Sequence, residues 1–222
     1  MTSNCLTYKK KYTKMKKLIV AVLLGIMAIP NMAQEWRVGA TAGANVNATT
    51  GVHYRGQTGF NVGVKAELGL PQATKGLYVD FGALLSSHGW KRGYYDNSTA
   101  TILEWKAIPY YLNIPVHVGY KFRCSDNFKL FASAGPYVNI GLFGKEKMIA
   151  TLGEVSTKTP VLNNVFADKA QERFDWGLGF RVGAELYDHW QLSVGYDWGM
   201  ESIFKDKDVR NRTLSVSCSY VF

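Results

Sequence analysis

Beyond its first 33 residues the sequence lacks a long hydrophobic run. A transmembrane helix needs about 20 consecutive, mostly apolar residues, and no later stretch approaches that length. Apolar residues still make up 47% of the 222 residues, enough for one domain with a sizeable core. A membrane location would therefore have to be built from strands, because only helices and closed barrels span a bilayer.

Cysteine is also scarce, with three in the chain. Cys5 lies in the N-terminal segment. Cys124 falls at the end of the fourth strand-like run and Cys218 inside the eighth, and these two runs would lie on opposite walls of a closed barrel. A disulfide needs Cα atoms within about 7 Å, so we expect both to be unpaired. Neither has neighbours spaced for metal binding or catalysis, and we predict no catalytic, metal or cofactor-binding residues.

Acidic residues are absent before Glu35, and lysines are concentrated there. The lysines of this segment are Lys9, Lys10, Lys11, Lys14, Lys16 and Lys17. They account for most of the net charge of +9. Because a basic leader explains that charge, we expect no nucleic-acid partner.

The same segment has the features of an export signal. Its lysines are followed by an apolar run over 18–29 and by a weakly small-residue end at Ala33. The sequence therefore predicts a leader and signal peptide over 1–33, followed by one domain over 34–222. Translation starts at Met1 or Met15, and an uncleaved N-terminal anchor is the alternative.

From residue 36 onward, apolar and polar residues alternate with a period of two, which is typical of strands with two different faces. The alternating runs cover 36–47, 60–69, 77–86, 108–122, 128–142, 175–186, 190–201 and 213–222. Pro109 and Pro115 interrupt the fourth run. Since proline cannot donate to a strand ladder, we expect a bulge or locally broken pairing near Pro115.

The connections between these runs alternate in length. Short connections lie at 71–75, 123–127 and 187–189, and longer ones at 48–57, 88–104, 144–174 and 202–212. Short turns on one rim and long loops on the other are typical of bacterial outer-membrane barrels, whose termini lie in the periplasm. We therefore expect an all-β fold, an eight-stranded antiparallel up-and-down transmembrane β-barrel integral to the outer membrane.

A soluble barrel of the lipocalin type would also alternate, but with its apolar face inward. Glycine recurs on the polar face, as expected where side chains crowd into a narrow interior. The aromatic residues of the apolar face gather near strand ends in two girdles, which favours the membrane barrel. One girdle holds Trp36, Tyr120, Phe122, Phe128, Trp190, Tyr220 and Phe222, and the other holds Phe60, Trp105, Tyr110, Trp176 and Trp198.

Charged residues of both signs fall on the predicted inward face. Charges removed from bulk water must be paired to be tolerated, so we predict a salt-bridged network that plugs the barrel. Its candidate members are Arg37, Lys65, Glu67, Asp80, Arg181, Glu185, Asp197 and Glu201, with Lys121, Lys129 and Asp175 on the same face. Side chains just fill an eight-stranded interior, which argues against a wide pore.

Four different short motifs lie in successive runs: Tyr-Leu-Asn-Ile-Pro at 111–115, Ala-Gly-Pro-Tyr at 134–137, Gly-Leu-Gly at 177–179 and Tyr-Val-Phe at 220–222. With them the chain resembles the PorT-like outer-membrane β-barrel family common in Bacteroidetes, over 34–222. The resemblance implies an outer-membrane barrel. It also implies that the barrel-insertion machinery recognises the final strand, with Tyr220 and Phe222 as its assembly signal.

The long loops are where recognition would occur, because exposed residues on a rigid scaffold commonly bind partners. The connection 88–104 carries Trp90, Tyr94 and Tyr95, and 144–174 is rich in charge. We expect a structural or surface-binding scaffold whose loops contact outer-membrane lipid and lipopolysaccharide, or an extracellular or envelope protein. A narrow porin-like channel and a component of an export apparatus, as in PorT, are alternatives.

A lipid-modifying enzyme is the remaining alternative, since a nucleophile beside a base is the requirement for acyl transfer. His117 falls on the inward face, as do Ser215, Ser217 and Ser219. These serines belong to the eighth run and the histidine to the fourth, on opposite sides of a barrel. We therefore predict that the protein is not an enzyme.

Overall fold

The computed structural model describes residues 35–50, 54–70, 75–97, 99, 101–152, 155–167, 171–204 and 208–222. The expected leader over 1–33 lies outside these residues. Among the residues described, no helix is long and apolar enough to cross a membrane. Cys124, at the end of the fifth strand, and Cys218, in the last strand, are both free and exposed.

The described residues form ten strands. They are β1 (Glu35–Thr49), β2 (Tyr54–Gly69), β3 (Leu77–Ser87), β4 (Trp90–Asp96), β5 (Thr101–Ser125), β6 (Phe128–Leu152), β7 (Val155–Leu162), β8 (Phe174–Leu186), β9 (Trp190–Ser202) and β10 (Arg210–Val221). Each strand of the sequence prediction is present, and all pairings are antiparallel.

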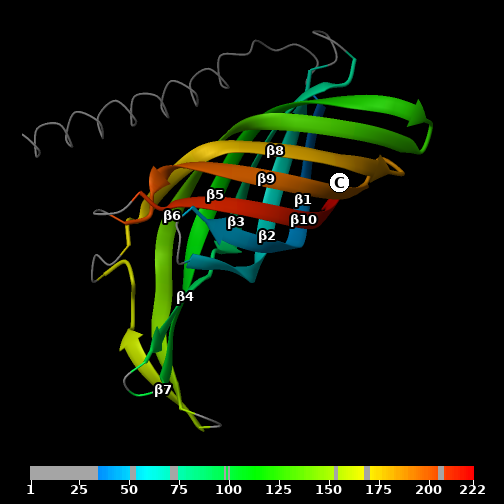
Figure 1. The fold of residues 1–222 in the computed structure, drawn as a ribbon. Helices are drawn as coiled ribbons and strands as arrows, with labels where there is room; N and C mark the ends of the chain where they lie inside the picture. Colours follow the sequence, from blue (N-terminus) through cyan, green and yellow to red (C-terminus); the bar gives the residue numbers. More distant parts are fainter. Residues whose placement is uncertain are drawn as a thin grey trace, which may run out of the picture. The chain divides into compact units, whose positions relative to one another are not determined.

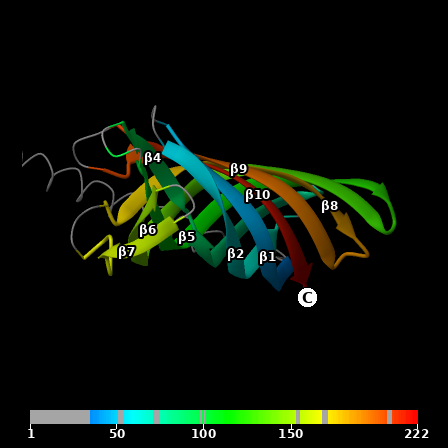
Figure 2. The same ribbon diagram turned by 60° about the horizontal axis from the view of Figure 1, so that its bottom comes forward.

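A ring of strands in the order β1, β2, β3, β5, β6, β8, β9 and β10 closes the sheet. Closure is made by β1 and β10, paired from Gly39 opposite Val221 to Thr49 opposite Asn211. Figures 1 and 2 both show the red β10 beside the blue β1. The expected eight-stranded antiparallel barrel is thus confirmed.

The barrel turns its polar face inward, as expected for a membrane barrel and opposite to the lipocalin arrangement. On β1, Asn45 and Asn47 are buried at 3% and 0% exposure, whereas Val38 and Val46 are 56% and 47% exposed. The same alternation runs through the other strands of the ring. A continuous apolar surface therefore surrounds the barrel.

Aromatic side chains stand at the rim that carries the short turns, termed the short-turn rim. Trp36, Phe122, Trp190 and Phe222 are each more than half exposed on the outer surface. At the opposite, long-loop rim, Phe60 and Trp198 face outward. Trp105 does not, because its position in β5 has inward parity. It packs against a buried cluster of Trp90, Ala107, Ile203 and Val209.

The long connections 88–104 and 144–174 were expected to be loops, and this was wrong for much of their length. β4 continues the line of β3 and pairs with both β2 and β5, from Trp90 opposite Ala107. β5 and β6 run on together as far as Ile102 opposite Thr151, and β7 adds to β6. Figure 1 shows β4 to β7 reaching past the other strands. We term β4, β7 and the parts of β5 and β6 that pair with them, 101–107 and 146–152, the sheet extension.

The ladders of β5 are interrupted near its two prolines. On the β3 side, pairing stops between Val116 opposite Phe81 and Asn113 opposite Leu84, which confirms the broken pairing expected near Pro115. On the β6 side, the register shifts between Tyr110 and Tyr111, next to Pro109. The break thus lies at one proline and the bulge at the other.

Candidate functional site

Two buried glutamates stand on opposite walls of the barrel near the short-turn rim. Glu67 belongs to β2 and Glu185 to β8, and their side chains are 3% and 0% exposed. Lys121 Nζ lies 2.6 Å from an oxygen of each, so one ammonium group joins the two walls. Arg37 Nη1 contacts the same carboxylates at 3.4 and 3.0 Å.

Gln191 and Lys65 extend this cluster. The Gln191 amide donates to Glu67 Oε1 at 2.8 Å and to Glu185 Oε2 at 2.7 Å. Lys65 Nζ donates to Gln191 Oε1 at 2.9 Å and pairs with Glu67 at 3.0 Å and Asp80 at 3.5 Å. Each buried carboxylate is therefore matched by cations and by an amide, as burial of charge requires.

A further cation closes the cluster at the rim. Lys129 Nζ lies 3.3 Å from Glu185 Oε1 and also binds Asp188, in the turn between β8 and β9. The hydrogen bond from Lys129 holds the pKa of Asp188 below its ordinary value. Arg37 donates to the backbone carbonyl of Asp188. The residues of this cluster, Arg37, Lys65, Glu67, Asp80, Lys121, Lys129, Glu185 and Gln191, are termed the charge network.

The structure gathers most, but not all, of the inward charges that the sequence singled out. Those that join the charge network are Arg37, Lys65, Glu67, Asp80, Lys121, Lys129 and Glu185. Arg181 and Asp197 form a separate ion pair of 2.6 Å deeper in the barrel. Glu201 lies at the other end of β9, where it accepts a hydrogen bond from Trp176 Nε1 at 3.4 Å.

The sequence analysis did not assign Gln191 to the network, because an uncharged side chain does not by itself require an ionic partner. The register explains it: Gln191 stands directly opposite Glu185 on the paired strands β8 and β9. Its inward parity in the seventh run was the available signal.

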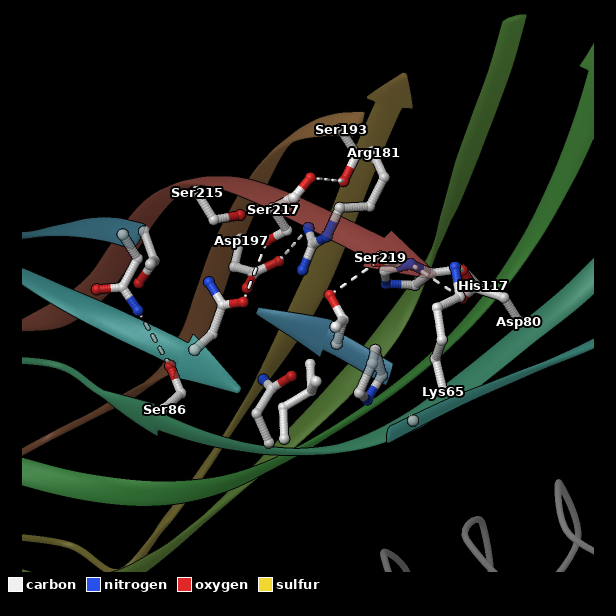
Figure 3. A pocket seen from close by; sticks show the side chains of 18 of the residues that line it. Lys65, Asp80, Ser86, His117, Arg181, Ser193, Asp197, Ser215, Ser217 and Ser219 are labelled. Carbon is white, nitrogen blue, oxygen red and sulfur yellow. Dashed lines mark hydrogen bonds and ion pairs between the residues drawn. The ribbon is translucent and has the colours of Figure 1, made fainter. Parts of the chain in front are cut away.

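A polar cavity of about 80 Å³ occupies the middle of the barrel. Figure 3 shows side chains of several strands around it, including the Arg181–Asp197 pair and the serines of β10. Nδ1 of His88 and Nε2 of His117, both in its wall, have no hydrogen-bond partner among the described residues. Since a water molecule occupies about 30 Å³ in the liquid, this space suits a few waters and is far from a diffusion pore.

Among the described residues, His117 Nε2 has no hydrogen-bond partner, so it is not bonded to the inward serines of β10. Its Nδ1 lies 3.7 Å from Asp80 Oδ1, whereas Ser217 Oγ donates to Asn61 Oδ1 at 3.1 Å. Nucleophilic catalysis needs the nucleophile within hydrogen-bond reach of its base. Ser86 Oγ and His88 Nε2, by contrast, lie 2.9 Å apart, a pair that the sequence prediction did not single out. No group of the described residues could hold a metal ion.

The connection between β7 and β8 closes the long-loop rim from inside. Val165 and Phe166 are buried at 0% and 3% exposure, and the Phe166 ring packs edge-on against Tyr111, 5.3 Å between centroids. The Val165 N–H donates to the Gly144 carbonyl at 3.0 Å. Val165, Phe166 and Tyr111 are termed the apolar cap. Part of the connection 144–174 is thus interior, not the exposed loop that the sequence led us to expect.

Gly141 makes room for this cap. A Cβ atom at Gly141 would stand 2.5 Å from Phe166 Cε1. We expect Gly141→Val to lower the free energy of unfolding by about 1–3 kcal/mol, because overpacking has costs of this size. Adding Phe166→Ala should recover part of the loss, measurable as a coupling energy in a double-mutant cycle of urea unfolding. Strictly additive effects would contradict the contact.

A second apolar cluster lies at the same rim. Trp90, expected in an exposed loop, is buried at 5% exposure and packs with Ala107, Ile203 and Val209. The aromatic residues that do face solvent in this region are Tyr94 and Tyr95, at 60% and 54% exposure. Trp90 was misplaced because a lone tryptophan in a long connection shows no periodicity that would reveal its partners.

Comparison with known families gives one match. Residues 32–205 match the outer membrane protein beta-barrel domain. The match confirms the expected family in its general form, while the finer resemblance to PorT-like proteins stays a prediction. A comparison with curated proteins found no match.

Several solved structures are similar to this chain at low sequence identity. The attachment invasion locus protein Ail of Yersinia pestis is 14% identical, with a TM-score of 0.40, covering 85% of this chain and 99% of its own. Neisserial surface protein A is 15% identical, with a TM-score of 0.41, covering 86% and 100%. The outer membrane protein OprG from Pseudomonas aeruginosa is 9% identical, with a TM-score of 0.40, covering 84% and 95%.

Proposed function

Since this chain belongs to the outer membrane protein beta-barrel domain family, we propose that it is a non-conducting, non-enzymatic scaffold of the outer membrane. Its barrel is integral to that membrane. The short turns and the first and last residues of the barrel strands lie in the periplasm, as in bacterial outer-membrane barrels generally. The sheet extension then stands on the extracellular side and is available for binding.

The observation that carries this proposal is that the interior is closed at two levels. Near the periplasm, Lys121 ties Glu67 to Glu185 across the barrel at 2.6 Å. Near the outside, Phe166 and Val165 fill the mouth. Between the two levels lies a cavity of only about 80 Å³. An ion would have to displace both closures to cross.

Single-channel recording on refolded protein in planar bilayers tests the closed interior. We expect the current to stay at baseline, beside a porin of known conductance as the positive control. The variant Phe166→Ala should also stay closed, because the charge network remains. Stable conducting steps in the unaltered protein would overturn the scaffold and favour the narrow porin-like channel.

The binding side of the proposal concerns the exposed residues of the sheet extension. Tyr94 and Tyr95 project from β4. Every residue of β7 is exposed except the last, Leu162. Exposed aromatic residues on a rigid strand pair lose little conformational entropy on binding, which suits recognition of an extracellular or envelope protein. Tyr94→Ala with Tyr95→Ala should abolish capture of such a partner from the cell envelope, with Tyr187→Ala, exposed at the other rim, as the matched control.

A role in an export apparatus, as the PorT-like resemblance implies, is a second candidate. It shares the exposed extension as its docking surface. Secretion assays on a deletion strain would separate the two, since a general scaffold predicts normal export.

A further inference from the structure

We propose that the outward face of the sheet extension binds the phosphate groups of an outer-leaflet lipid, the lipid A part of lipopolysaccharide. The site consists of Lys106, Lys145, Lys147 and Lys158 above the apolar side chains Ile108, Tyr110, Phe143 and Ile149, which together line a groove of about 500 Å³. It is termed the lysine groove. The inference rests on the membrane location of the barrel and not on whether its interior is closed.

The pairing of the strands places like charges directly opposite each other. Lys91 of β4 faces Lys106 of β5, and Lys106 faces Lys147 of β6. Like charges at directly opposite positions destabilise a sheet. Glu104 relieves part of this repulsion, at 3.8 Å from Lys91 on the edge of the row. A ligand with several negative charges would relieve the rest.

Two further lysines extend this row of lysines on the side of β6 and β7. Lys145 lies two residues along β6 from Lys147, on the same face, and is paired with Ile108. Lys158 of β7 stands opposite Ile149 and is exposed. The lysines converge on one groove from three strands, which is the arrangement that a multiply charged phosphate headgroup would need.

The apolar part of the groove faces the same way as the lipid-facing wall. Phe143 is 50% exposed, and its ring lies 4.8 Å from that of Tyr110. Tyr110 also contacts Phe60, with ring centroids 6.1 Å apart, at the upper end of the outer apolar surface. From Ile108 the outward side chains of β5 continue as apolar residues down to Phe122 at the opposite rim.

This continuity decides between a lipid and a soluble anion. A water-soluble sulfated sugar would use the lysines and leave the apolar floor exposed. A phosphorylated lipid uses both, because its acyl chains lie against the barrel wall while its phosphates reach the lysines just above the apolar band. Basic residues at a membrane surface attract anionic headgroups with about 1 kcal/mol each.

The test uses the full barrel, refolded in a phosphate-free, uncharged detergent. The variant carries Lys106→Gln and Lys147→Gln, and the matched control is Lys75→Gln, an exposed lysine at the short-turn rim. Binding of lipid A is measured by native mass spectrometry, beside enzymatically dephosphorylated lipid A. We expect the double variant to bind lipid A about 25-fold more weakly, from about fivefold for each lysine, and the control to bind it normally.

Unfolding temperatures supply a second readout. The difference in unfolding temperature between the double variant and the unaltered protein should change sign when lipid A is added. Without lipid A, the double variant should be as stable as the unaltered protein or more stable, because repulsion between lysines is removed. With lipid A, the unaltered protein should become the more stable of the two. Equal binding of both lipids, unchanged binding by the double variant, or preference for a soluble sulfated polysaccharide over lipid A would each overturn the site.

Discussion

Replacing Glu185 by alanine should lower the free energy of unfolding by about 3–5 kcal/mol, the range seen when one partner of a buried ion pair is removed. The Glu185 carboxylate is fully buried and contacts Arg37 at 3.0 Å, Lys121 at 2.6 Å and Lys129 at 3.3 Å. It also accepts a hydrogen bond from Gln191 at 2.7 Å. Its loss leaves Arg37 and Lys121 to share the carboxylate of Glu67.

Urea unfolding of the refolded protein, followed by the change in gel mobility on heating, measures this loss. Glu185→Gln keeps the size of the side chain and removes its charge, so we expect an intermediate effect. Glu35→Ala is the matched control, because Glu35 is exposed at the same rim. A Glu185→Ala protein as stable as the control would contradict the charge network as a stabilising element.

The sequence predicted the wall of the barrel well because the two faces of a strand alternate at every residue. This local rule placed Val38 outward and Asn45 inward without knowledge of any partner strand. It could not reveal which inward charges meet. Glu67 and Glu185 are 118 residues apart in the numbering (185 − 67), and Lys121 bridges them only because the register of the closed ring sets all three at one height.

The sheet extension escaped prediction for a physical reason. Within a membrane, the outer face of a strand must be apolar, and that requirement makes the pattern readable. Outside the membrane the requirement ends, so Glu104 and Lys106 share a face with Ile102 and Ile108. The alternation is still present in the backbone, but hydropathy no longer follows it.

Phe131 shows the same limit inside the barrel. It is buried at 6% exposure among inward positions, where the pattern predicts polar or small residues. Gly183 on the neighbouring β8 accommodates it, since a Cβ atom there would stand 2.5 Å from the Phe131 ring. Such a pair becomes visible only when the register brings the two positions together.

Deleting Phe222 should block assembly of the barrel in cells while changing the stability of the folded barrel little. The side chain is 71% exposed, and its ring lies 5.1 Å from that of Tyr220 on the outer surface. Its N–H donates to the Val38 carbonyl at 2.8 Å. Loss of one such hydrogen bond costs about 1 kcal/mol, and the main closure of β1 with β10 lies in the other pairs.

The expected loss in cells has a different origin, namely recognition of the last strand by the insertion machinery, as the family resemblance implies. The comparison with Glu185→Ala separates the two causes. The glutamate variant should be weakened both in refolding and in cells, whereas the Phe222 deletion should refold normally from urea and fail only in cells. Phe222→Tyr keeps the aromatic ring and should assemble. If the deletion gives a normal yield of heat-modifiable barrel in the outer membrane, the terminal aromatic residue is not an assembly signal.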